Sequence, residues 1–129
     1  MSNSYRDLIV WQKARVLVRD LYSVTRHFPS DERFGLISQV RRAGVSVIAN
    51  IAEGQGRNTP GEFLHFLGMT KGSLTELETE LMISDDLGYL RPEEAKDLPT
   101  KCDEVSRLLN GLMQAIAKRN PSSDVSTRN

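Results

Sequence analysis

The chain has 129 residues, of which 39% are hydrophobic and 26% are charged, a balance typical of one folded domain and not of a disordered or fibrous chain. Lys and Arg number 17, as do Asp and Glu, so the net charge by itself predicts no anionic partner. No apolar run approaches the roughly 18 to 20 residues of a membrane span, and the N-terminal sequence does not resemble a secretion signal. A lone cysteine, Cys102, cannot form an internal disulfide. We therefore expect a cytoplasmic protein with no membrane partner.

The first half of the chain predicts two amphipathic helices. Apolar residues recur at three- and four-residue spacing over residues 8–27, and Pro29 ends this pattern. A second helix is expected over residues 34–53, after the acidic start that includes Asp31. Gly54 then suits the left-handed conformation that closes many helix C-termini. One side of the second helix forms an almost entirely polar line: Gln39, Arg42, Ser46, Asn50 and Glu53.

The second half predicts two longer helices. Thr59 and Glu62, on either side of Pro60 and Gly61, form a capping box, which predicts a helix over residues 60–87. Gly88 ends that helix. A fourth helix is expected over residues 92–118.

Pro99 lies inside the fourth helical pattern, where its missing amide predicts a kink or a break. Residues 120–129 have little to bury, and we expect a disordered tail there. Four amphipathic helices with short connections and no strand pattern predict an all-α fold for residues 1–119, an antiparallel up-and-down four-helix bundle.

Few residues suggest chemistry. His27 and His65 are well separated, and Cys102 lies on the apolar side of its helix, so each is expected to be an ordinary surface or packing residue. Glu76 and Glu80 are one turn apart, but they lack the Glu-x-x-His pattern of metal-binding bundles, which favours a solvated or salt-bridged acidic face. We therefore expect no enzyme activity, no metal and no cofactor.

Charge is unevenly distributed along the chain. Residues 1–57 carry nine Lys and Arg against five Asp and Glu, whereas residues 58–91 carry two against six. These regions could attract each other within the bundle, or the basic half could present a patch to an anionic polymer. The candidates for a nucleic-acid patch are Lys13, Arg15, Arg19, Arg41 and Arg57, with scattered solvated charge as the alternative.

The polar line on the second helix could form a hydrogen-bonded structural seam, or it could contact phosphate or another subunit. The candidate seam or interface residues are Gln39, Arg42, Ser46, Asn50, Glu53, Glu76 and Thr79.

Two segments carry a family resemblance: QVRRAGVSVIANIAEGQGR, residues 39–57, and GSLTELETEL, residues 72–81. With DLIVWQKA and the final amphipathic helix, the chain resembles, over residues 6–117, the four-helix bundle proteins encoded in intervening sequences of bacterial 23S rRNA genes. It departs from the family pattern at Thr70, where the family favours alanine, and at Gly44, where the family favours an apolar residue or alanine. The resemblance supports the predicted bundle.

The resemblance implies a ring-like homopentamer. It extends to the accessory variability determinant of diversity-generating retroelements, whose role involves a reverse transcriptase and nucleic acid bound through basic surface residues. We therefore expect a non-enzymatic homo-oligomer that binds RNA, DNA or a nucleic-acid-processing protein such as a reverse transcriptase. The alternative is a protein-interaction scaffold without nucleic-acid binding, in which the arginines pair with the acidic third helix within or between subunits.

Overall fold

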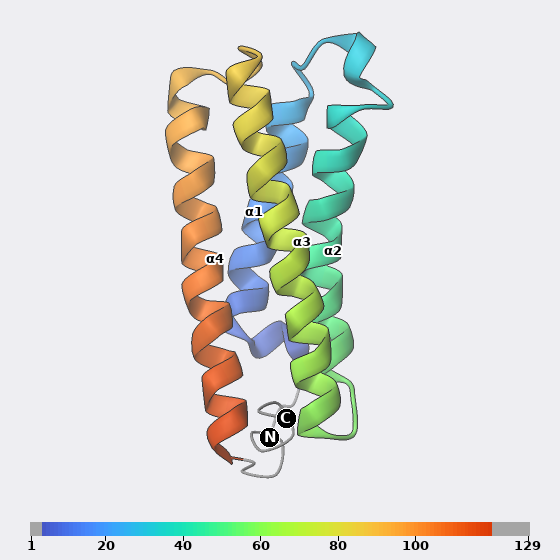
Figure 1. Cartoon of the computed structure of the whole chain (residues 1–129), viewed down its shortest axis with the longest axis vertical. Coiled ribbons are helices and arrows are strands. Elements are labelled where there is room, and N and C mark those ends of the chain that lie inside the picture. The colour runs from blue at the N-terminus through green and yellow to red at the C-terminus, as the bar shows by residue number, and fades with distance from the viewer. Residues whose placement is uncertain (1–3, 120–129) are drawn as a thin grey trace.

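The computed structural model describes residues 4–119, which form an up-and-down bundle of four helices (Figure 1). The predicted all-α bundle is confirmed, and the described residues contain no strand. Each helix packs against two neighbours. Helices α1 and α3 each contact both α2 and α4. The main helices are α1 (Ile9–Thr25), α2 (Leu36–Gln55), α3 (Pro60–Asp86) and α4 (Pro92–Arg119), with short 3-10 helices η1 (Tyr5–Asp7) and η2 (Ser30–Glu32) before α1 and α2.

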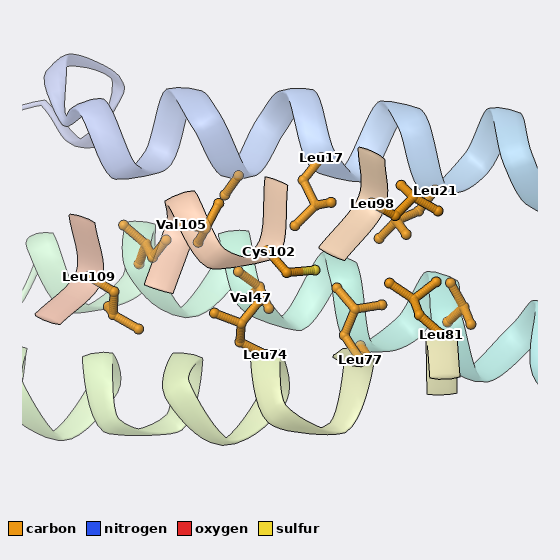
Figure 2. Close-up of a cluster of buried hydrophobic side chains, with 14 of the residues drawn as sticks. Leu17, Leu21, Val47, Leu74, Leu77, Leu81, Leu98, Cys102, Val105 and Leu109 are labelled. Atoms are coloured by element: carbon orange, nitrogen blue, oxygen red, sulfur yellow. The ribbon is translucent and has the colours of Figure 1, made fainter. Parts of the chain in front are cut away.

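The core runs along the axis of the bundle and draws leucine and valine side chains from all four helices (Figure 2). These are the residues that the three- and four-residue spacing placed on one side of each helix, and burying them is the main favourable term in folding. The fully buried large side chains include Leu17, Leu21, Val40, Val47, Ile51, Leu67, Leu77, Leu98, Val105 and Leu109.

The connection between α1 and α2 differs from the expected one. Helix α2 begins at Leu36 and not near Phe34, after the turn of η2. The Leu36 amide donates to Glu32 Oε1 at 3.0 Å, and the Tyr89 hydroxyl donates to Glu32 Oε2 at 2.9 Å. These two hydrogen bonds, the one from Leu36 first, lower the pKa of Glu32. Glu32 therefore caps α2 and ties it to the turn between α3 and α4.

Helix α3 starts where the capping signal placed it. The Thr59 hydroxyl accepts a hydrogen bond from the Glu62 amide at 3.1 Å. Glu62 Oε1 accepts from the Asn58 amide at 3.3 Å, one residue before the position that a capping box requires. The start of the helix is thus satisfied by a variant of the expected motif.

Gly88 ends α3 as predicted. Its φ is 79°, in the left-handed region that glycine adopts without a steric penalty. The Tyr89 amide donates to the Ser84 carbonyl at 2.9 Å, and the Gly88 amide donates to the Asp85 carbonyl at 2.9 Å. These two bonds form a Schellman motif.

The prediction for Gly54 is wrong, because this glycine lies inside α2 and is buried. A Cβ atom added at Gly54 would lie 2.9 Å from Phe63 Cδ1 and 2.9 Å from Phe66 Cβ. Glycine is therefore required at this position by the close approach of α3 to α2. The backbone there is not left-handed.

Helix α4 continues through Pro99 without the break that we considered. The next residue, Thr100, donates its hydroxyl to the Lys96 carbonyl at 3.0 Å. The predicted tail at residues 120–129 lies outside the described residues.

Candidate nucleic-acid interface

One side of α1, continued by its C-cap residue Arg26, carries three exposed arginines with a tyrosine among them. Arg15, Arg19, Tyr22 and Arg26 follow at spacings of four, three and four residues, which places them in line on a helix with 3.6 residues per turn. The single acidic residue of α1, Asp20, lies on the side that faces α4, where it pairs with Lys101. We name Arg15, Arg19, Tyr22 and Arg26 the α1 basic stripe.

Aromatic rings support two of the guanidinium groups near this stripe. The Arg15 guanidinium lies 5.7 Å from the centre of the Trp11 ring, and the Arg41 guanidinium lies 4.5 Å from the centre of the Tyr22 ring. Stacked arginine and aromatic side chains are a common means of holding phosphates and bases. The α1 basic stripe therefore combines positive charge with ring faces.

Arg41 reaches the stripe from α2, and two of its nitrogen atoms donate hydrogen bonds to α1. Its Nε donates to Thr25 Oγ1 at 2.8 Å, and its Nη2 donates to the Tyr22 carbonyl at 3.3 Å. Thr25 is buried and also donates to the Leu21 carbonyl at 2.7 Å. The predicted phosphate contact at Arg41 is thus also a link between α1 and α2.

The other predicted cations do not join this surface. Lys13 Nζ lies 3.6 Å from Glu104 Oε2 on α4. Arg57 lies at the opposite end of the bundle, where its Nη2 is 3.2 Å from Glu53 Oε2 and its guanidinium stacks on Phe66. Of the five candidates, the structure brings together Arg15, Arg19 and Arg41. Sequence reasoning missed Arg26, although its position 11 residues after Arg15 is close to a whole number of helical turns.

The polar line on α2 meets α3 over part of its length. Ser46 and Ser73 hydroxyls are 2.7 Å apart, and Asn50 Nδ2 donates to the Ser46 carbonyl at 2.9 Å. A shallow pocket of about 210 Å³ lies beside these bonds, and the residues that line it are Gln39, Arg42, Ala43, Ser46 and Glu76.

Two members of the candidate seam lie apart from this pocket. Glu53 pairs with Arg57, and Thr79 donates its hydroxyl to the Thr75 carbonyl of its own helix at 2.9 Å. Arg42 is exposed and forms no ion pair or hydrogen bond within residues 4–119. The expected seam is therefore a short serine and asparagine network with unpaired charge beside it.

Glu80 contradicts the expectation of a solvated or salt-bridged pair with Glu76. It is 6% exposed, and its Oε1 atom is buried without a hydrogen-bond partner in the described part of the chain. Burial, followed by the charge of Glu76 and a hydrogen bond with it, raises the pKa of Glu80 to about 7. Glu80 thus titrates near neutral pH, a property that helical spacing alone did not indicate.

The three residues considered for chemistry lie in separate places. Cys102 is buried in the core, where desolvation raises the pKa of its thiol to about 12 (Figure 2). His27 Nε2 lies 3.0 Å from Glu94 Oε2, and His65 is exposed on α3. Among residues 4–119, no group of three or more His, Cys, Asp or Glu side chains could hold a metal ion. None of the described helices is long and apolar enough for a bilayer span.

Fold and surface together define a small four-helix bundle protein with a basic, aromatic-supported face along its first helix. The chain belongs to the 23S rRNA-intervening sequence protein family, whose model matches residues 6–111. No curated protein matches the chain.

A solved structure has the same fold. It is a protein of unknown function from the S23 ribosomal protein family of Bacteroides thetaiotaomicron VPI-5482, with a TM-score of 0.71 and 22% sequence identity. The match covers 81% of this chain and 98% of that one. This likeness supports the bundle architecture and leaves function to be argued from the surface.

Proposed function

We propose that this chain is a cytoplasmic, non-enzymatic homo-oligomer that binds the phosphate backbone of RNA or DNA through the α1 basic stripe. The observation that carries the proposal is the alignment of Arg15, Arg19 and Arg26 on one exposed helix side with no acidic residue among them. Four residues advance a helix by about 6 Å, so Arg15 and Arg19 can reach neighbouring phosphates of one strand.

Three cations per chain give weak binding, since each neutralised phosphate contributes modestly. A closed ring of identical subunits repeats the stripe at regular angles. Contacts on one polymer then become effectively intramolecular, which multiplies the affinity without new residues. A homo-oligomer, pentameric as the family resemblance implies, supplies the avidity that a single stripe lacks.

The test is binding of a fluorescein-labelled single-stranded RNA and of a labelled DNA duplex, measured by anisotropy from about 50 to about 200 mM salt. Affinity should fall steeply with salt, and the variant R15A/R19A/R26A should show a salt slope smaller by about one for each phosphate that it no longer neutralises. The matched control is K71A/K96A/K118A, which removes three exposed cations from α3 and α4. Equal binding by both variants contradicts the stripe as the site.

A second candidate function is a protein-interaction scaffold without nucleic acid. The observation that favours it is exposed apolar surface, above all Phe34, which is 89% exposed. Large exposed apolar side chains next to charged ones are typical of protein contact sites. Nucleic-acid affinity that is absent or independent of salt favours the scaffold over the first proposal.

A further inference from the structure

An open groove of about 510 Å³ lies between the C-terminal half of α1 and the N-terminal half of α2. Its lining contains three arginines and no acidic residue. It also contains Phe34, 89% exposed, and Val45, 42% exposed. We name this surface the α2 groove, defined by Tyr22, Arg33, Phe34, Arg41, Arg42 and Val45.

A surface with exposed apolar side chains and negative charge lies at the C-terminal end of α3. Met82 is 66% exposed, Ile83 44% and Leu87 53%, and the exposed carboxylates of Asp85 and Asp86 lie among them. We name Met82, Ile83, Asp85, Asp86 and Leu87 the α3 patch. It is apolar and acidic, whereas the α2 groove is apolar and basic.

The charges of these two surfaces are not neutralised within the chain. Each of the four ion pairs in residues 4–119 takes its carboxylate from α1, α2 or α4, and none involves Arg33, Arg42, Asp85 or Asp86. The α2 groove is lined by α1 and the start of α2, with no residue of α3. No residue of the α3 patch lines the α2 groove, so the two surfaces are separate sites on one molecule.

Both surfaces lie at the same end of the bundle (Figure 1). Helix α2 begins there and α3 ends there, and the hydrogen bond from Tyr89 to Glu32 joins the two turns. Two copies aligned side by side in the same direction thus place the groove of one level with the patch of the next. A head-to-tail contact without a shift along the axis can close into a ring if its rotation divides a full turn, whereas a shift along the axis produces a helical filament.

We infer that the α2 groove of one copy receives the α3 patch of a second copy, with Phe34 against Met82 and Ile83, and Arg33 and Arg42 beside Asp85 and Asp86. The inference rests on the homo-oligomer proposed above and assigns the surfaces that join its subunits. Apolar burial supplies the favourable term, and the charge arrangement selects this pairing over groove against groove or patch against patch.

The experiment measures self-association of the full chain by sedimentation velocity over a range of protein concentrations. Two variants each reverse the charge of one surface: R33E/R42E in the groove and D85K/D86K in the patch. Each should weaken association by at least about 100-fold, because like charges then face each other across the contact. A chain that carries all four substitutions restores opposite charges, and its association should return to within about tenfold of the original.

The control K96E/K118E changes the net charge as much as R33E/R42E does, but on exposed α4 positions. It should associate like the unaltered chain. F34S tests the apolar part of the contact at a position that the bundle does not bury, and it should also weaken association. Circular dichroism melts verify that every variant folds.

The outcomes separate the two proposals. An unaltered chain that is monomeric at all concentrations overturns the homo-oligomer and this contact with it. Association that survives both single-surface reversals, or that the four-residue exchange fails to restore, overturns the assigned surfaces alone. RNA that crosslinks to the groove, with association unchanged by the reversals, assigns the α2 groove to nucleic acid and likewise overturns the contact.

Discussion

The raised pKa of Glu80 makes the stability of the bundle depend on pH near neutrality. A carboxyl whose folded-state pKa lies above its unfolded value stabilises the fold fully below the unfolded pKa, and that contribution is lost as pH rises through the folded pKa. For Glu80 this loss begins near pH 4.5 and is complete a little above pH 7. The substitution E80Q retains an uncharged side chain at every pH, and its amide can donate to Glu76 as the protonated acid does.

The expected magnitude follows from the size of the pKa change. One pKa unit corresponds to about 1.4 kcal/mol, so the shift of Glu80 from 4.5 to about 7 corresponds to about 3 kcal/mol at pH above 8. E80Q should therefore be more stable than the unaltered chain by up to about 3 kcal/mol at pH 8.5, with the difference shrinking towards zero at about pH 4.5.

Urea denaturation at a series of pH values measures this difference, with protein concentration held fixed because self-association also contributes to stability. E93Q is the matched control, since Glu93 is an exposed carboxyl in the first turn of α4, and it should shift stability little at any pH. A stability change for E80Q that is the same at pH 5 and pH 8.5, or a loss at pH 8.5, refutes the reasoning.

Two further predictions concern the close packing of the bundle. G54A should lower the free energy of unfolding by about 1 to 3 kcal/mol in urea denaturation, because its methyl group would lie 2.9 Å from two atoms of α3. G68A has no heavy atom within 4 Å of its added Cβ and should instead raise the free energy of unfolding by up to about 1 kcal/mol. Equal effects of the two substitutions would contradict the packing argument. The Cys102 thiol should react with a disulfide reagent at pH 8 only as fast as the chain unfolds, because the core buries it and raises its pKa to about 12; rapid labelling under native conditions would show that the core opens.

Local patterns predicted the helices well, because a helix is decided over a few turns of chain. The apolar spacing of α1 placed Leu17 and Leu21 in the core. The hydroxyl of Thr59 and the backbone freedom of Gly88 marked the two ends of α3. Each of these features depends on residues within about one turn of each other, so the sequence alone contains the information.

The same patterns failed where the deciding neighbour comes from another helix. Gly54 was interpreted as a helix end, yet what requires a glycine there is the approach of Phe63 and Phe66 from α3. Arg41 was considered a candidate nucleic-acid contact, yet it also contacts Tyr22 and Thr25 of α1.

By itself, then, the sequence determined that this protein is four amphipathic helices with a basic first half and an acidic third helix. The tertiary structure decided which groups meet, with Arg41 of α2 held against Tyr22 and Thr25 of α1, and with Glu80 buried. The physical reason is that helical periodicity depends on neighbours along the chain, whereas burial and charge pairing depend on how each helix is rotated against the others.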